Sequence, residues 1–342
     1  MEFLSQIEST IDRFALYSRD SALILMVSGG ADSVALLRAF ASEELPPCTT
    51  FEVLHVNHGL RGVQADKDAH FVEDMCQALG VRCHIVSCDV AAYAHKHELN
   101  LEDAGRIIRY REANVHLDRL CIQRACLPSE SHIVTAHTLD DRIETFFWRA
   151  LWGAGTGALG STAAVRENVI RPLIATTREE IEAYLDQLGQ PWCEDATNQD
   201  ISRIRAAIRH ALVPVCEQIR PTFRRSLQRT MDLAAGDNEV LERMERAFAR
   251  DFVRQGEEDE QLDFIVPMMR TLDSTMRART VRCALFEAFP EARRIGGAHI
   301  DALVEAFDCD SFARDLGYGL RATLKYDTLR ITKTGEKGEC GE

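Results

Sequence analysis

The sequence has no apolar stretch long enough to cross a membrane, and it has no paired-cysteine motif. The apolar run at residues 22–27 is too short for a secretory signal and follows charged residues. The eleven cysteines include no Cys-x-x-Cys pair, which disfavours both a disulfide framework and a structural zinc site. These absences predict a reduced, cytoplasmic protein with no membrane partner. A length of 342 residues predicts one large or two medium domains.

The glycine turn near the start of the chain lacks the Gly-Lys-Ser/Thr ending of a Walker A loop. It reads Ser28-Gly29-Gly30-Ala31-Asp32-Ser33, between an apolar run that predicts a buried strand and an apolar-periodic helix. Backbone N–H groups at a helix start have no intrahelical acceptor, so this arrangement predicts an anion site. Ser28 and Ser33 add hydroxyl donors, and Asp32 adds a carboxylate suited to a Mg²⁺ ion on phosphates. The alternative is an ordinary strand–turn–helix corner.

Strands and helices alternate over the first two thirds of the chain. Strands are predicted at 23–27, 51–56, 81–86, 132–136 and 170–173, and helices at 1–20, after Asp32, and at 66–79, 100–126, 139–151 and 178–188. Asn100 is the predicted N-cap of the fourth of these helices. Alternation of this kind predicts right-handed crossovers and an α/β fold with a Rossmann-like parallel sheet.

From residue 214 onward the pattern becomes mainly helical. Helices are predicted at 222–254, 270–289 and 298–308, followed by a small hairpin within 318–332. We therefore expect a catalytic domain over 1–213, a mainly helical C-terminal domain over 214–332, and a flexible tail over 333–342.

Polar clusters follow three of the predicted strands, at residues 28–33, 55–61 and 137–141. Ligands of parallel sheets bind beyond the carboxyl ends of the strands, so these clusters predict one shared site. His58 and Arg61, beyond the second strand, are candidate nucleotide contacts, whereas His55 within the strand is more simply structural. Arg109, with Arg106 and Tyr110, is a candidate phosphate clamp, although a solvated helix face has the same appearance.

Four chemistry-bearing side chains begin the helix at 139–151, namely His137, Asp140, Asp141 and Glu144. The carboxylates are candidates for holding Mg²⁺ or for deprotonating an amine nucleophile, and His137 is a candidate phosphate contact. Which carboxylate acts as the base is left open. The alternative is that acids favour a helix N-terminus because of its dipole.

The formal net charge of −14 argues against a generic nucleic-acid coating protein. A basic island nevertheless lies between Arg203 and Arg229, and it holds seven arginines against one acid. Arg203, Arg205 and Arg209 are candidate contacts to an RNA backbone. The alternative is that they pair with the acids at 194–200.

In this order, the motifs resemble the tRNA(Ile)-lysidine synthetases, a family of PP-loop ATP pyrophosphatases. The resemblance is carried by the loop at 28–33, His58 to Arg61, Asn100 to Tyr110, Ala136 to Thr145, Gly153 and Gly155, Arg171 to Leu173, Trp192 to Asn198, Arg205, Arg209, Pro214 and the hairpin at 326–329. Three positions depart from the family pattern. Ala206 replaces a polar residue, Trp152 replaces an arginine, and Thr138 replaces a frequent second histidine.

The resemblance implies a two-step reaction. ATP adenylates C2 of the wobble cytidine in the isoleucine tRNA with a CAU anticodon, and pyrophosphate leaves. Free L-lysine then displaces AMP to give lysidine. It also implies that residues 28–33 with His58, Arg61 and Arg109 bind ATP and that Asp32 and Asp141 hold Mg²⁺. Catalysis would involve Asp32, His137, Asp140, Asp141 and Glu144, and the chain would be a short family form without a second C-terminal domain. The oligomeric state stays open, with a homodimer as one arrangement.

Three other functions compete with this interpretation. A PP-loop tRNA 2-thiolation enzyme would need catalytic cysteines or an iron–sulfur cluster, and we expect no cysteine of this chain beside the loop motifs. A PP-loop amide synthetase is disfavoured because no amidotransferase domain is recognisable. A non-catalytic tRNA-binding module is disfavoured by the intact Ser28, Asp32, Asp141 and Glu144.

Overall fold

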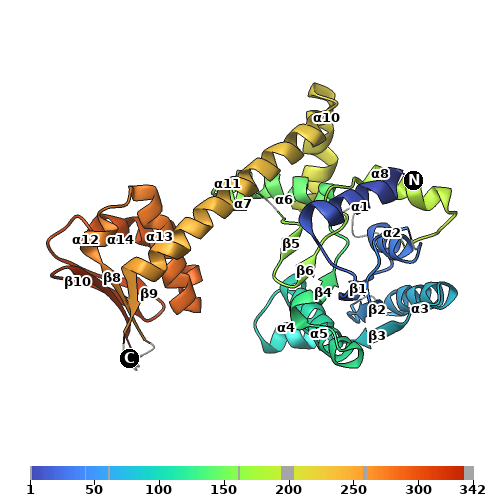
Figure 1. Ribbon diagram of the computed structural model, residues 1–342, viewed down its shortest axis with the longest axis horizontal. Helices are drawn as coiled ribbons and strands as arrows, with labels where there is room; N and C mark the ends of the chain where they lie inside the picture. Colours follow the sequence, from blue (N-terminus) through green and yellow to red (C-terminus); the bar gives the residue numbers. More distant parts are fainter. Residues whose placement is uncertain are drawn as a thin grey trace. The chain divides into compact units, whose positions relative to one another are not determined.

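The structure is a computed structural model that describes residues 2–42, 44–60, 62–160, 162–193, 204–256 and 260–334. Its internal contacts divide the chain into two units, and the division falls between Ala235 and Gly236. That point lies inside the long helix α11 (Phe223–Phe252) (Figure 1). The domain boundary predicted at 213/214 stays a prediction. It was placed where helical periodicity begins, whereas α10 and the first part of α11 belong to the first unit by their contacts.

A mainly parallel sheet organises the first unit. Its strands, within the described residues, have the order β3-β2-β1-β4-β6-β5, and only β5 pairs antiparallel. The strands are β1 (Ala22–Met26), β2 (Thr50–Asn57), β3 (Cys83–Ser87), β4 (His132–Val134), β5 (Val165–Arg166) and β6 (Val169–Ile170). The predicted Rossmann-like parallel sheet is thereby confirmed.

Ten α-helices precede α11 in the described residues, and some of them cover the two faces of this sheet. They are α1 (Glu2–Phe14), α2 (Ala31–Phe40), α3 (Val63–Ala78), α4 (Val90–Lys96), α5 (Leu101–Arg124), α6 (Leu139–Leu151), α7 (Thr156–Leu159), α8 (Arg178–Gln187), α9 (Ile204–Ala207) and α10 (Val213–Ile219). Side chains of β1 alternate between two cores, as the period of two requires. Leu23 and Leu25 pack with α1, α2, α3 and α8, whereas Ile24 packs with α5.

The chain order creates a switch point beside β1. After β1 the chain builds β2 and β3 on one side, and it then crosses back to place β4 on the other side. The segments that follow β1 and β4 therefore diverge at the same edge of the sheet. A crevice for ligands forms at such a point in open α/β sheets.

Local signals located several elements correctly. Helix α6 has the predicted bounds, and the side chain of Asn100 caps α5 by accepting a hydrogen bond from the Asp103 N–H at 2.8 Å. The sequence interpretation missed α4, α7 and β5. These elements are short, so their periodicity is hard to detect.

The second unit packs helices against an antiparallel sheet with the order β7-β8-β11-β10-β9 among the described residues. Its elements after α11 are β7 (Val253–Gln255), β8 (Gln261–Ile265), α12 (Val266–Met269), α13 (Ser274–Ala288), α14 (Gly297–Ala306), β9 (Phe312–Gly317), β10 (Leu320–Lys325) and β11 (Thr328–Lys333). The predicted hairpin is β10–β11, which joins β8 and β9 in a larger sheet. Lys333 belongs to β11, and the rest of the predicted tail from residue 335 lies outside the described residues.

The two units have separate apolar cores, which predicts separate unfolding. Leu25 is buried in the first core and Phe264 in the second. Leu25→Ala and Phe264→Ala should each cost about 3 kcal/mol, because each leaves a cavity. In calorimetry we expect each variant to lower one of two transitions and to leave the other within about 1 °C.

Val63→Ala is the matched control, because Val63 is 72% exposed. A single transition that both core variants lower equally would contradict independent folding of the two units.

Candidate active site

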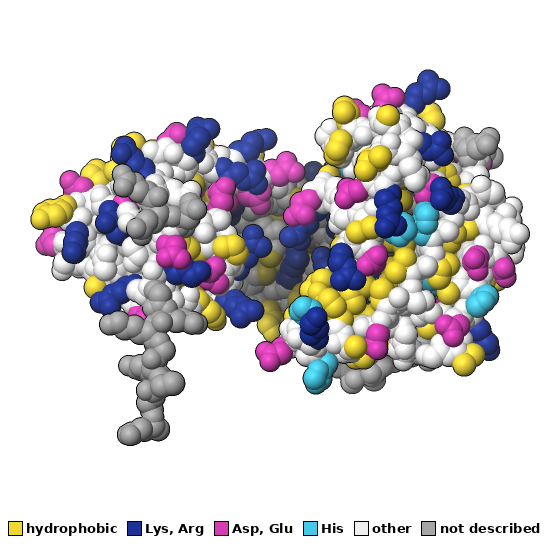
Figure 2. Space-filling view, turned by 90° about the horizontal axis from the view of Figure 1, so that it is seen from below, with side chains coloured by type: hydrophobic (Ala, Val, Ile, Leu, Met, Phe, Trp, Pro, Cys, Tyr) yellow, Lys and Arg dark blue, Asp and Glu magenta, His cyan; other side chains and the backbone are white. Residues whose placement is uncertain are grey.

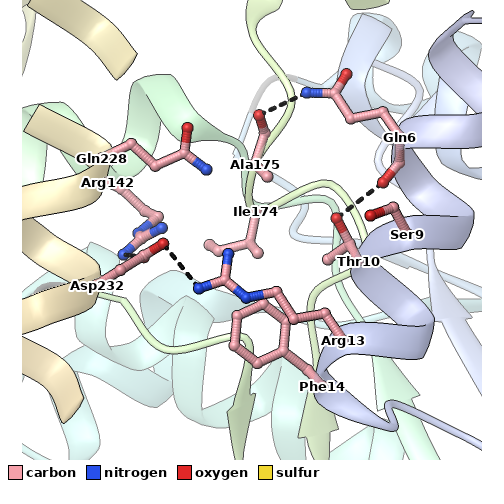
Figure 3. Close-up of a pocket in the computed structure, with 10 residues that line it drawn as sticks. All are labelled: Gln6, Ser9, Thr10, Arg13, Phe14, Arg142, Ile174, Ala175, Gln228 and Asp232. Atoms are coloured by element: carbon pink, nitrogen blue, oxygen red, sulfur yellow. Dashed lines mark hydrogen bonds and ion pairs between the residues drawn. The ribbon is translucent and has the colours of Figure 1, made fainter. Parts of the chain in front are cut away.

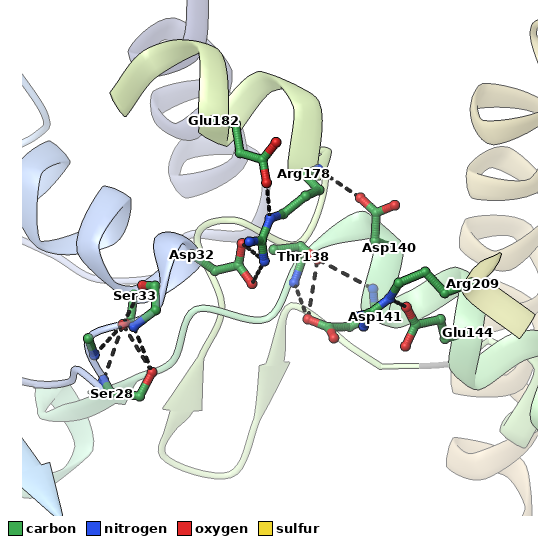
Figure 4. A network of polar contacts seen from close by, with 12 residues as sticks. Ser28, Asp32, Ser33, Thr138, Asp140, Asp141, Glu144, Arg178, Glu182 and Arg209 are labelled. Carbon is green, nitrogen blue, oxygen red and sulfur yellow. Dashed lines mark hydrogen bonds and ion pairs between the residues drawn. The ribbon is translucent and has the colours of Figure 1, made fainter. Parts of the chain in front are cut away.

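The loop after β1 is a compact hydrogen-bonded turn around Ser33. The backbone N–H groups of Ser28 and Gly29 both donate to Ser33 Oγ, each at 3.1 Å, and Ser33 Oγ donates to the Gly30 carbonyl at 2.9 Å. The Ser28 hydroxyl lies 3.2 Å from that of Ser33 (Figure 4). Gly30 is the N-cap of α2, and no side chain caps this helix start. The N–H groups of Ala31 and Asp32 are thereby presented as an anion cradle.

Gly29 is required by both conformation and packing. Its φ of +97° lies in the region that favours glycine, and an added Cβ would lie 3.3 Å from Cys193 Sγ. The Cys193 N–H also donates to the Gly29 carbonyl at 2.9 Å. The expectation that no cysteine lies beside the loop is therefore wrong. Cys193 is distant from the loop in sequence, and only the fold brings it there.

Asp32, within the loop, contacts a cation that the sequence analysis did not identify. Arg178, at the start of α8, approaches Asp32 Oδ1 to 3.4 Å and bonds Glu182 at 2.6 Å (Figure 4). Burial raises the pKa of Asp32 to about 6, with Arg178 opposing the shift and Asp141 and Asp140 adding to it. A cation bound beside Asp32 would stabilise its ionised form, which suits the predicted role of this residue as a metal ligand.

Asp141 and Asp140 are both engaged at the start of α6. Asp141 and Thr138 form a capping box, in which the Thr138 N–H donates to Asp141 Oδ2 at 2.8 Å. The departure from the family pattern at Thr138 thus supplies the N-cap. Asp140 accepts from the Arg178 N–H at 2.8 Å and pairs with Arg224 through its other oxygen. Asp140 is therefore the most neutralised of these acids.

Glu144 is buried and pairs with an arginine of the basic island. Its Oε1 accepts from Arg209 Nε at 2.6 Å, and Arg209 lies in a π-helical turn, Ile208–Leu212, which follows α9. Burial raises the pKa of Glu144, while Arg209 lowers it. A small apolar core of Ile143, Ile208 and Met231 packs α6 against this turn and α11. The alternative that the arginines pair with the acids at 194–200 stays untested, because those acids lie outside the described residues, and the described partner of Arg209 is Glu144.

His137 is half-buried and lies near Asp141. Its Nδ1 lies 2.8 Å from the Thr135 hydroxyl. Burial lowers the pKa of His137 to about 4, with Asp141 opposing and Arg171, Arg106 and Arg109 adding to the shift. The imidazole is therefore neutral near pH 7. The structure thus brings Arg109 of α5 into electrostatic range of the acidic cluster.

Two predicted nucleotide contacts are less directly supported. The ring of His58 packs on α5, where an added Cβ at Gly105 would lie 3.6 Å from its Cε1. Arg61 lies outside the described residues, as do Arg203 and the acids at 194–200. His55 is structural as expected, because its buried Nδ1 lies 2.9 Å from the Val27 carbonyl oxygen.

The sequence analysis did not anticipate the contacts of Arg178 and Arg224. The side chain of Arg178 reaches Asp32, and the side chain of Arg224, from the basic island, reaches Asp140. Each contact comes from a helix that is distant along the chain, so no local spacing indicates it. The only available signal was the group of acids itself, because carboxylates removed from water need cations from elsewhere in the chain to balance their charge.

A separate cavity of about 230 Å³ lies behind α6, between α1, α11 and the loop at 174–175 (Figure 3). Asp232 of α11 accepts from Arg142 of α6 at 2.9 Å and from Arg13 of α1 at 3.2 Å. This pair of bonds fixes the buried side of α6, while the acidic residues occupy the other side. None of the cavity's lining residues belongs to the acidic cluster.

The described residues contain no group of three or more His, Cys, Asp or Glu that could hold a metal ion by itself. A Mg²⁺ ion in this site would therefore depend on one or two carboxylates together with nucleotide phosphates, as is usual for Mg²⁺. No helix in the described part of the chain is long and apolar enough to span a membrane.

A phosphate cradle and a carboxylate cluster at the switch point of a parallel sheet define the class of this protein. A family model described as the PP-loop domain matches residues 3–216, and the chain belongs to that family.

Curated relatives carry a more specific name. The tRNA(Ile)-lysidine synthase of Geobacter sulfurreducens is 33% identical over 313 residues, which cover 89% of this chain and 64% of that protein. The tRNA(Ile)-lysidine synthase of Deinococcus deserti is 40% identical over 220 residues, covering 64% and 38%. The chain therefore spans less than two thirds of the length of these relatives.

The solved structure of the U34-tRNA thiolase NcsA from Methanococcus maripaludis is similar to this chain in fold. The TM-score is 0.54 at 19% identity, and the match covers 69% of this chain and 78% of that one.

The electrostatics of Asp32 predict a pH-dependent stability. The unfolded chain loses the Asp32 proton near pH 3.8, whereas the folded state holds it to about pH 6. The unfolded state binds fewer protons between these values, so this residue lowers the stability of the fold as pH rises. We expect Asp32→Asn to be more stable than the wild type by about 2 kcal/mol at pH 7 and by much less at pH 4.5. Urea unfolding without Mg²⁺ or nucleotide measures both values.

Asp20→Asn is the control, since Asp20 is exposed on a turn. A stability difference for Asp32→Asn that does not change with pH would contradict the raised pKa.

Proposed function

We propose that this chain is an ATP-dependent ligase that attaches lysine to C2 of the wobble cytidine of the CAU-anticodon isoleucine tRNA. The observation that carries the proposal is the juxtaposition of the loop at 28–33 with the acidic start of α6 at one sheet edge. The names of the curated relatives support the choice of tRNA as substrate. The relatives whose names suggest this reaction are longer than this chain, so the activity of the whole protein is part of the proposal.

The loop fits the triphosphate of ATP. Uncapped N–H groups at the start of α2 and two serine hydroxyls supply donors, and the glycine conformation lets the backbone approach closely. These donors would stabilise the negative charge on the pyrophosphate as it leaves. Asp32 and Asp141 would hold Mg²⁺, which would neutralise further charge on the phosphates. Arg109 and His58 remain predicted nucleotide contacts.

The second step needs a neutral amine. The C2 oxygen of cytidine would first attack the α-phosphate, and the ε-amino group of lysine would then attack C2 while AMP leaves. Lysine is protonated at pH 7, so a carboxylate must accept a proton from it. Glu144 suits this role best, because burial raises its pKa, whereas both oxygens of Asp140 are already paired. His137 would act as a neutral hydrogen-bonding group.

The arginines that follow residue 203 would bind the tRNA. Arg205 is exposed on α9, one helical turn before Arg209. On the face drawn in Figure 2, basic and acidic side chains are interspersed, so the acidic charge is not concentrated there. The exposed arginines of this segment would supply local positive charge to a polyanion despite the net charge.

A tRNA 2-thiolation enzyme is the second candidate, and Cys193 beside Gly29 is the one observation that favours it. The described residues offer no set of three Cys, His, Asp or Glu ligands for a cluster. Lysine transfer therefore remains the better proposal, and the assay below separates the two.

The catalytic assignment predicts two kinds of defect among the carboxylate variants. With isoleucine tRNA, ATP and lysine, Asp32→Ala and Asp141→Ala should abolish AMP release. Glu144→Gln should retain one round of pyrophosphate release but lower lysine incorporation by about 100-fold, because only proton removal from the amine is lost. Radiolabelled lysine and pyrophosphate release measure the two steps.

Asp118→Ala, an exposed site on α5, should behave as the wild type. A transcript without the wobble cytidine should accept no lysine. Wild-type turnover in Asp32→Ala or Asp141→Ala would refute the assignment, and sulfur transfer without lysine incorporation would favour the thiolase.

The RNA assignment predicts that Arg205→Glu raises KM for tRNA at least tenfold and changes KM for ATP less than twofold. Arg209→Glu should lower kcat as well, because it leaves Glu144 without its cation. Steady-state kinetics at a fixed salt concentration separate the effects on KM from the effect on kcat.

Arg19→Glu, at an exposed turn, is the charge-matched control. Equal effects of Arg205→Glu on both KM values would count against a role in RNA binding.

A further inference from the structure

Helix α6 carries two exposed tryptophans on the stripe that also carries its carboxylates. Asp140, Glu144, Trp148 and Trp152 follow one another at intervals of four residues, and Trp152 is the C-cap. Residues four apart lie on one side of a helix. Glu144 is buried, whereas Trp148 is 38% and Trp152 64% exposed. The helix therefore begins inside the candidate active site and ends at the surface.

Neither tryptophan is needed by the apolar cores. The chain has three tryptophans, and Trp192 packs against the first core. The rings of Trp148 and Trp152 are 6.5 Å apart and tilted by 52°, so they are not stacked on each other. Leu151, also exposed, extends the apolar surface. Exposed aromatic groups of this size are characteristic of binding surfaces.

Arginines surround this aromatic surface. The guanidinium of Arg205 lies 6.0 Å from the centre of the Trp148 ring. Burial lowers the pKa of Arg149, and the nearby Arg166 and Arg205 lower it further, so three cations share the region. Their mutual repulsion leaves a positive field that would favour an anionic partner over an apolar or basic one.

We infer that Trp148 and Trp152 are a stacking platform for the unpaired bases of a tRNA anticodon loop. The inference rests on the proposed function and identifies which surface receives the loop. Single-stranded RNA is bound by aromatic rings that stack on bases and by arginines that follow the backbone. A duplex could use the arginines but not the rings, because its bases are already stacked.

The position of the platform suits a loop whose wobble base enters the site. Trp148 follows Glu144 by four residues, which is about 6 Å along the helix axis. Bases next to the reacting cytidine would therefore contact Trp148 and then Trp152.

The test is the affinity of the whole protein for a hairpin RNA with the CAU anticodon loop. Each of Trp148→Ala and Trp152→Ala should raise Kd about tenfold. The affinity for a duplex of equal length should change less than about twofold. Trp148→Phe and Trp152→Phe should keep Kd within about threefold of the wild type, since the ring is retained. Leu151→Ala is the control for lost exposed apolar area on the same turn.

Lysine incorporation by the wild type is measured in parallel, so the two proposals can fail separately. Active wild type with unchanged hairpin affinity in both alanine variants overturns the platform and leaves the ligase proposal standing. Tryptophan-dependent hairpin binding without lysine incorporation supports the platform and overturns the ligase. Conversion of a dimer to a monomer by the alanine variants, with unchanged hairpin affinity, would assign the surface to a second copy of the chain and overturn the inference.

Discussion

The structure of the first unit depends on compensating the acids that meet at the edge of its sheet. Asp32, Asp140 and Glu144 each take a cation from a segment that comes later in the chain. The cations belong to α8, the π-helical turn and α11. Since a carboxylate removed from water without a partner is costly, these pairs hold the later segments against α2 and α6. The site and the packing around it are therefore parts of one arrangement.

The negative charge of Asp32, the acid within the loop, is only partly balanced by a cation. Arg178 approaches it at 3.4 Å only, and the pKa of Asp32 stays raised at about 6. Asp140, in contrast, is neutralised from two directions. Acids in one cluster thus have different capacities to take a further cation or a proton. Helix α6 extends this division of roles, because it carries buried acids at its start and exposed rings at its end.

The sequence predicted those parts of the fold that depend on local pattern. The bounds of α6, the Asn100 cap and the parallel sheet all follow from periodicity, capping and alternation. The sheet of the second unit was recognised only as its last hairpin. β7 and β8 are short, and helices α12, α13 and α14 separate them from the other strands along the chain. Cys193 and Arg178 were not anticipated beside Asp32 and its loop, since each contact joins segments more than a hundred residues apart.

By itself the sequence determined where an anion cradle and a group of acids lie along the chain. A glycine turn between a strand and a helix makes an anion cradle, and acids at a helix start supply metal or proton chemistry, whichever cations lie nearby. Tertiary structure decided which acid is neutralised, which keeps a raised pKa and which aromatic side chains remain exposed. Those properties depend on burial and on distances between separate segments, and neither is encoded in local spacing.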